Sequence, residues 1–208
     1  MNNYRTLGTT FYQYEITVTK SLFIATVGFA DNTAAAQAIL ARVTKEHPHA
    51  THHCYAYLTA DGQKSCDDGE PSGTAGVPLL QAIQAQKLYN VVVVVTRYFG
   101  GVKLGTGGLA RAYGQAATTA LTNAPLAVAK LCERVVLTVP YDQAATVAQI
   151  TAAYGIVEER DYAERVRLQL AIPVTQVAAW REALPVAVRE QIKVVDPAVW
   201  VTVSVPTA

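Results

Sequence analysis

Five consecutive valines, Val91 to Val95, form the longest apolar run in this chain of 208 residues. The run is far shorter than the roughly 20 apolar residues that cross a membrane, but it has the length and the β-branched composition of a strand. A strand that is apolar on both faces is buried on both faces. We therefore expect residues 90–99 to form a central strand of a sheet.

The residues around this strand predict a mixed set of strands and helices. β-Branched and aromatic residues mark strands, whereas alanine-rich runs that follow a capping side chain mark helices. The predicted strands cover residues 12–18, 22–29, 51–59 and 90–99, and the predicted helices cover residues 33–46, a stretch that begins after a cap at Thr74 or Gly76, and residues 108–121. Polar or glycine-rich loops are expected over residues 61–72 and 100–107.

The pattern restarts after Asn123-Ala124-Pro125. Strands over 131–139, 155–160, 162–172 and 198–205 alternate with helices over 142–154 and 174–184, in the β-α-β-β-α-β order of the ferredoxin-like unit. Residues 128–208 also balance eight Lys and Arg against nine Asp and Glu, unlike the segment before them. We therefore predict two α+β domains, residues 1–127 and residues 128–208.

Bulk composition limits the class of protein but names no partner. Hydrophobic residues make up 51% of the chain, which is enough to bury a core. The three cysteines include no C-x-x-C pair, and the first residues lack the features of a signal peptide. A cytoplasmic protein without a membrane segment is the expectation.

Charge is distributed unevenly although the net charge is only +1. No Asp or Glu occurs from Pro71 to Cys132, and five cations fall inside this segment, namely Lys87, Arg97, Lys103, Arg111 and Lys130. Such a segment can present a positive field to a partner even when the whole protein is nearly neutral.

A glycine-rich loop lies within this acid-free segment. Residues 105–110 match the pattern G-x-G-x-x-G/A, but no acidic residue follows at the spacing that a dinucleotide site requires, and no Gly-Lys-Ser/Thr is present. Glycines and a helix amino end can still bind a phosphate on RNA or on a small molecule, or they can serve only a tight turn. The candidate phosphate- or nucleic-acid-binding residues are Arg97, Lys103, Gly105, Gly107, Gly108 and Arg111.

A second constellation combines an acidic loop with two histidines on a strand. Three carboxylates within four residues could hold a hard cation or act as acid and base, and they could equally form a solvated turn. Neighbouring strand residues point to opposite faces, so the two histidines do not suit one zinc ion. The possible polar site consists of His52, His53, Asp67, Asp68, Glu70, Ser72 and Thr74. No metal, cofactor or catalytic residue is predicted.

Three runs of sequence resemble the IMPACT family in its bacterial YigZ/YvyE form: residues 52–57, residues 67–76 and residues 94–114 (VVTRYFGGVKLGTGGLARAYG). The resemblance covers residues 20–125 and is specific, because the three motifs occur in the family's order. It implies an N-terminal domain with the fold of elongation factor G domain IV and the GHMP kinases (ribosomal S5 domain 2-like) and an appended ferredoxin-like domain. It also implies a link to translation.

These observations lead to one preferred function and two alternatives. The preferred function is a non-enzymatic protein that associates with RNA or the ribosome in translation or its regulation. One alternative is an enzyme or small-molecule binder that uses the glycine loop for phosphate and the Asp67/Asp68/Glu70 loop for metal or acid–base chemistry. The other is a protein-interaction module.

Overall fold

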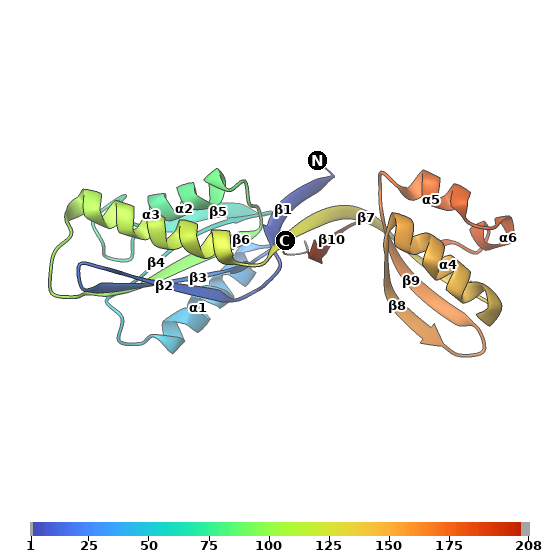
Figure 1. Cartoon of the computed structure of the whole chain (residues 1–208), viewed down its shortest axis with the longest axis horizontal. Coiled ribbons are helices and arrows are strands. Elements are labelled where there is room, and N and C mark those ends of the chain that lie inside the picture. The colour runs from blue at the N-terminus through green and yellow to red at the C-terminus, as the bar shows by residue number, and fades with distance from the viewer. Residues whose placement is uncertain (1, 205–208) are drawn as a thin grey trace. The chain divides into compact units, whose positions relative to one another are not determined.

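The computed structural model describes residues 2–204, which form two compact units. One unit comprises residues 4–128, and the other comprises residues 129–203 together with residues 2–3 (Figure 1). Each is built around its own sheet and its own hydrophobic core. None of the helices formed by the described residues is long and apolar enough to cross a membrane.

The first unit contains a five-stranded sheet in the order β2-β3-β6-β4-β5, in which the paired strands run antiparallel. Its strands are β2 (Tyr12–Val18), β3 (Ser21–Phe29), β4 (His52–Thr59), β5 (Gly62–Cys66) and β6 (Val91–Tyr98). The five valines are fully buried in β6, with β3 on one side and β4 on the other. The predicted central strand is therefore confirmed.

Helices cover both faces of this sheet, as the apolar central strand requires (Figure 1). Helix α1 (Thr33–Glu46) packs on the face that carries Val92 and Val94, and it begins at Asn32, whose Oδ1 accepts a hydrogen bond from the Ala35 amide. Helices α2 (Gly76–Ala85) and α3 (Gly105–Asn123) pack on the opposite face.

Helices α2 and α3 lie side by side and run in the same direction. A Cβ atom at Gly114 would lie 3.8 Å from the Pro78 ring, and Gln86, eight residues further on, donates hydrogen bonds to Thr118 and Thr122. Both helices thus begin toward the same end of the unit, where β6 ends.

Three details differ from the sequence-based expectation. Strand β5 lies inside the predicted polar loop and forms because it pairs with β4, although its sequence lacks β-branched residues. Strand β1 (Asn3–Leu7) was not predicted. Helix α3 begins three residues earlier than expected, at Gly105, although the glycines of its first turn have low intrinsic helix propensity.

The second unit has the predicted β-α-β-β-α-β order, which confirms the ferredoxin-like topology. Its elements are β7 (Leu126–Val139), α4 (Tyr141–Tyr154), β8 (Ile156–Tyr162), β9 (Val166–Pro173), α5 (Val177–Ala183), the short α6 (Val186–Arg189) and β10 (Lys193–Ser204). The sheet has the order β1-β7-β9-β8, and β10 also pairs with β7; most of β1 and the first three residues of β7 belong to the first unit. Trp180 is fully buried at the centre of the core, where its indole nitrogen donates to Thr151.

Candidate functional site

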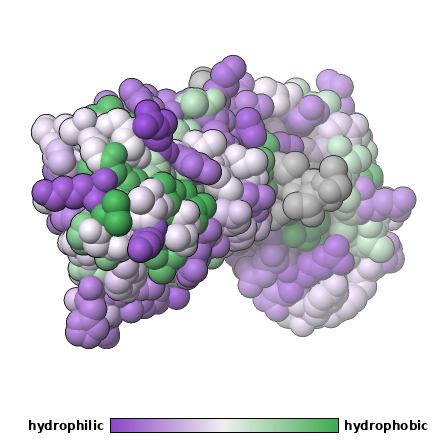
Figure 2. All heavy atoms as spheres, turned by 60° about the vertical axis from the view of Figure 1, so that its left-hand side comes forward, coloured by the Kyte–Doolittle hydropathy of each residue, from purple (hydrophilic) through white to green (hydrophobic). Residues whose placement is uncertain are grey.

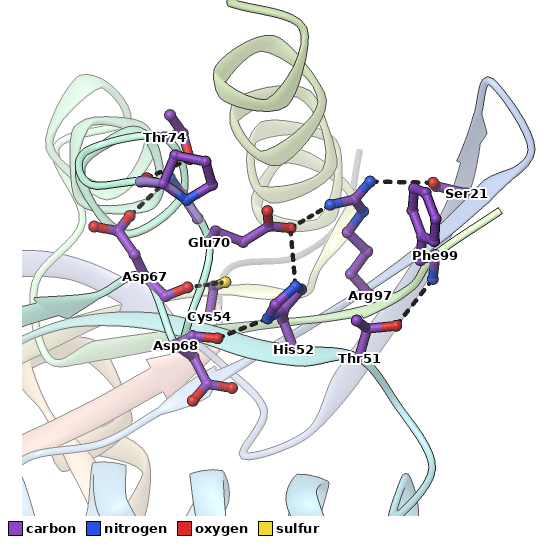
Figure 3. A network of polar contacts seen from close by, with 12 residues as sticks. Ser21, Thr51, His52, Cys54, Asp67, Asp68, Glu70, Thr74, Arg97 and Phe99 are labelled. Atoms are coloured by element: carbon purple, nitrogen blue, oxygen red, sulfur yellow. Dashed lines mark hydrogen bonds and ion pairs between the residues drawn. The ribbon is translucent and has the colours of Figure 1, made fainter. Parts of the chain in front are cut away.

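The amino end of α2 is closed by a carboxylate of the acidic loop (Figure 3). Asp67 Oδ1 accepts hydrogen bonds from the amides of Ala75 (2.9 Å) and Gly76 (2.8 Å), and its Oδ2 accepts one from Gly73 (2.8 Å). Burial alone would raise the pKa of Asp67, but these three amides outweigh it and lower the pKa below its ordinary value. Asp67 therefore caps the helix that follows it.

This arrangement corrects the predicted cap. Neither Thr74 nor Gly76 caps α2 through a side chain. The Thr74 hydroxyl instead donates to the Pro71 carbonyl at 2.6 Å, and Asp67 reaches the helix from eight residues upstream. A contact at that separation has no local sequence signature.

Glu70 lies in a buried cluster that links the acidic loop to α3 and β6. Its Oε1 accepts hydrogen bonds from Arg97 Nη1 (2.5 Å) and from the Tyr113 hydroxyl (2.8 Å). The Glu70 and Arg97 side chains are only 4% and 5% exposed. Burial raises the pKa of the Tyr113 hydroxyl, so Tyr113 is a neutral donor to the carboxylate. The ion pair is therefore shielded from water and from salt.

The two histidines point in different directions, as expected from strand alternation. His52 Nδ1 lies 2.7 Å from the Asp68 carbonyl and so carries the proton of that hydrogen bond, while its Nε2 lies 3.8 Å from Glu70 Oε1 (Figure 3). His53 Nδ1 instead lies 3.1 Å from the Thr96 hydroxyl. Burial lowers the pKa of His53.

The remaining groups of the acidic loop also bind the chain itself. The Asp68 carboxylate accepts the His53 amide hydrogen at 2.6 Å, and the Cys54 thiol, whose pKa burial raises to about 12, donates to the Asp67 carbonyl. Ser72 is exposed on the loop. Within residues 2–204, no three His, Cys, Asp or Glu side chains are grouped so that they could hold a metal ion.

The glycine loop leads directly into α3. Gly105 has φ +70°, a conformation that favours glycine, and a side chain there would meet nothing within 4 Å. Leu104 occupies the N-cap position, no described side chain caps the helix, and the first turn contains no acidic residue. The leading amides of α3 are thus available to an acceptor from outside the chain.

Two exposed cations flank this open helix end. Lys103 precedes it, and Arg111 lies on the solvent side of α3, opposite the buried Leu109 as the helical spacing predicts. Arg111 Nη1 lies 3.6 Å from the position that a Cβ atom of Gly107 would occupy. A Cβ atom at Gly108 would approach Leu104 to 3.0 Å, so Gly108 serves close packing rather than an open surface.

A cavity of about 460 Å³ brings the two constellations together. His52, Glu70 and Arg97 contribute from the polar cluster, and the loop before α3 and its first turn contribute from the glycine-rich side. Gly100 lets the chain after β6 pass close to the β2–β3 turn, because a Cβ atom there would lie 2.1 Å from the Lys20 backbone. The lining residues from the end of β6 onward include Phe99, Lys103, Leu104, Gly105, Thr106 and Leu109.

Arg97 differs from its expected role. Arg97 lines the cavity, but its side chain lies on the face of β6 that α2 and α3 cover. Its charge is paired with Glu70, so it is not an exposed cation available to a phosphate. Two further residues were not predicted from the sequence: Ser21, whose Oγ lies 3.3 Å from Arg97 Nη2, and Thr106 of the cavity wall. Their only sequence signals were a break between strands and a place in the glycine loop.

Comparison with known sequences identifies both units. Residues 19–121 match the Impact N-terminal domain, and residues 137–185 match a domain of unknown function, DUF1949. The chain is 34% identical over 174 residues to the IMPACT family member YvyE of Bacillus subtilis, covering 82% of this chain and 80% of that protein. It is 35% identical over 173 residues to the IMPACT family member YigZ of Escherichia coli, covering 80% of this chain and 85% of that protein.

A solved structure has the same architecture. The crystal structure of a hypothetical protein superposes with a TM-score of 0.64 at 30% sequence identity, covering 93% of this chain and 96% of that one.

Proposed function

The chain belongs to the IMPACT family, and we propose that it is a non-enzymatic protein that binds RNA, free or within the ribosome, and acts in translation or its regulation. The observation that carries the proposal is the open amino end of α3 between Lys103 and Arg111. An uncapped helix end with two exposed cations attracts phosphate through amide hydrogens, the helix dipole and direct charge. The family's link to translation supports RNA as the source of that phosphate.

The composition of the surrounding segment strengthens this interpretation. No carboxylate belongs to residues 71–132, and the nearby Glu70 is neutralised by Arg97. Phosphate contacts of this kind read no sequence, so the proposed binding is electrostatic and tolerant of RNA sequence.

The enzyme alternative receives less support from the acidic loop. Asp67, Asp68 and Glu70 each accept hydrogen bonds from groups of the chain itself. A carboxylate that caps a helix or holds a buried guanidinium is not poised to take a proton from a substrate. In the proposed function, the acidic loop therefore has a structural role.

The test compares two double variants of equal charge change. Lys103→Ala/Arg111→Ala removes the two cations beside α3, whereas Arg42→Ala/Lys45→Ala removes two exposed cations from α1 on the opposite face of the sheet. Affinity for a duplex RNA is measured by fluorescence anisotropy across a range of salt concentrations. Binding should weaken as salt rises, because binding releases condensed counterions from the RNA and this release gains less free energy at higher salt.

The first double variant should bind more weakly and reduce the slope of log affinity against log salt by up to about two units, roughly 0.7 to 0.9 for each lost contact. The α1 variant should change the slope little, and both should unfold within about 1 kcal/mol of the parent protein, because the four side chains are exposed and the Arg42–Glu46 pair lies at the surface. Co-sedimentation with ribosomes should follow the same order. An RNA affinity that is indifferent to salt and equal in both variants contradicts the proposal.

A further inference from the structure

The cavity at the end of β6 shares Lys103 and the first residues of α3 with the open helix end, and it has further features that a phosphate-binding surface does not need. It encloses about 460 Å³, within the range of about 300 to 1,000 Å³ that small-molecule sites occupy. A site of this size can take one small group, whereas an RNA duplex can only lie across its mouth.

The charges around the cavity leave a positive surplus. Glu70 and Arg97 cancel one another at 2.5 Å, so the cation that remains in the wall is Lys103. Gly105 and Thr106, the first two residues of α3, line the same wall, and no described side chain caps them. The wall therefore suits a small anion such as a phosphate group.

A buried donor at the cavity lacks a partner. Arg97 Nε is one of two buried side-chain nitrogen or oxygen atoms in the described residues that make no hydrogen bond, although Nη1 and Nη2 of the same side chain are bonded to Glu70 and Ser21. Buried donors are nearly always satisfied, so this one needs an explanation. The side chain that carries this unpaired donor is part of the cavity lining.

An exposed aromatic ring forms another part of the lining. Phe99 is 46% exposed, and the Arg97 guanidinium carbon lies 5.4 Å from its ring centroid. Val102, 42% exposed, lies in the same loop. In Figure 2, which brings this end of the unit toward the viewer, hydrophobic and strongly hydrophilic atoms lie side by side on the surface. An exposed ring beside a phosphate site is a stacking platform for an unpaired base.

We infer that the cavity binds one unpaired nucleotide, with its phosphate at Lys103 and the amino end of α3 and its base on Phe99. This inference rests on the proposed function for the source of the nucleotide, because single-stranded RNA and a free nucleoside monophosphate present the same chemistry. The inferred nucleotide site adds a preference for unpaired bases, which the electrostatic surface alone does not provide. Single strands should bind more tightly than a duplex of equal charge.

The experiment uses the full chain and three soluble probes, adenosine 5′-monophosphate, adenosine and inorganic phosphate, followed by NMR chemical-shift titration. The monophosphate should shift the amides of residues 99–106 and bind at least about tenfold more tightly than either adenosine or phosphate alone. Phe99→Ala should lower monophosphate affinity about tenfold, since stacking on one aromatic ring contributes about 1 to 3 kcal/mol per base. Phe99→Tyr, which keeps a stacking ring, should restore it.

A second arm compares single-stranded and duplex RNA of equal length. Phe99→Ala should weaken single-strand binding about tenfold and leave duplex binding unchanged, which reports on the cavity alone. Loss of duplex binding in Lys103→Ala/Arg111→Ala reports on the proposed RNA surface instead. Equal single-strand and duplex affinities with no effect of Phe99→Ala, or no shift at residues 99–106 with the monophosphate, overturn the inference even if duplex binding stands.

Discussion

Helices α2 and α3 pack side by side in the same direction, yet their amino ends are built differently. Neither helix has an acidic residue in its first turn or a side-chain cap at its own N-cap position. Asp67 closes the amino end of α2, because its carboxylate accepts hydrogen bonds from three backbone amides, in the preceding loop and at the start of the helix. The end of α3 has exposed Lys103 and Arg111 beside it and no capping side chain among the described residues.

This difference is the basis for proposing that the amino end of α3, and not that of α2, binds a partner. A helix end that is satisfied by its own carboxylate has little attraction left for an external anion. An end that is flanked by cations and left open gains free energy when an external anion arrives. In the proposed function, the acidic loop closes one helix end and the glycine loop leaves the other open.

Glu70 connects the two ends and should give the largest effect on stability. Glu70→Ala leaves Arg97 buried without its counter-ion, and breaking a buried pair from one side costs about 3 to 5 kcal/mol. Urea denaturation measures the change in the free energy of unfolding. Glu46→Ala is the matched control, because it breaks the exposed pair with Arg42 and should cost less than about 1 kcal/mol. Similar losses in the two variants would show that the cluster does not hold the ends together.

Asp67 should give the next largest effect. Asp67→Ala leaves three amides without their acceptor, and the loss of a cap of this kind costs about 2 kcal/mol at pH 7. Because the folded-state pKa of Asp67 is below its ordinary value of 3.8, its contribution is present above about pH 4 and disappears as pH falls through the lower folded-state value.

The measurement for Asp67 is the difference in unfolding free energy between parent and Asp67→Ala from pH 7 to pH 2. The difference should be constant near neutrality and shrink below about pH 4. A difference that stays constant to pH 2 would mean that the carboxylate charge has no part in closing α2.

The helices and strands were predicted correctly wherever neighbouring residues in the sequence determine them. Five valines located the central strand, the capping residues Asp31-Asn32-Thr33 marked the start of α1, and the alternation of strands and helices after residue 125 indicated the ferredoxin-like order. Strand β5 was missed because Gly62–Cys66 has no strand-forming composition and is held only by pairing with β4.

The site residues were identified by type, but their pairing was not. Glu70 meets Arg97 and Tyr113, which lie 27 and 43 positions away in the sequence. No local pattern encodes such contacts, so three neighbouring carboxylates could equally have been a metal site, a catalytic pair or a turn. Arg97 was predicted to bind phosphate for the same reason: its partner Glu70 is remote in the sequence, and its burial on β6 could not be seen from local residues.

The most direct test of the account places an acid at the open end of α3 and leaves everything else unchanged. Gly107→Asp puts a carboxylate in the first turn beside Arg111, where there is room for a side chain, and Gly107→Asn is its neutral control of equal size. The Asp variant should be more stable than the Asn variant by about 0.5 to 1 kcal/mol, because an acid in the first turn complements the helix dipole.

RNA affinity should move in the opposite direction. The Asp variant should bind RNA at least about fivefold more weakly than the Asn variant, since like charges about 4 Å apart repel by about 1 kcal/mol even in water. Increased stability with weakened binding, measured on the same two proteins, is the result that an open, anion-binding helix end predicts. Equal RNA affinities for the Asp and Asn variants would contradict it.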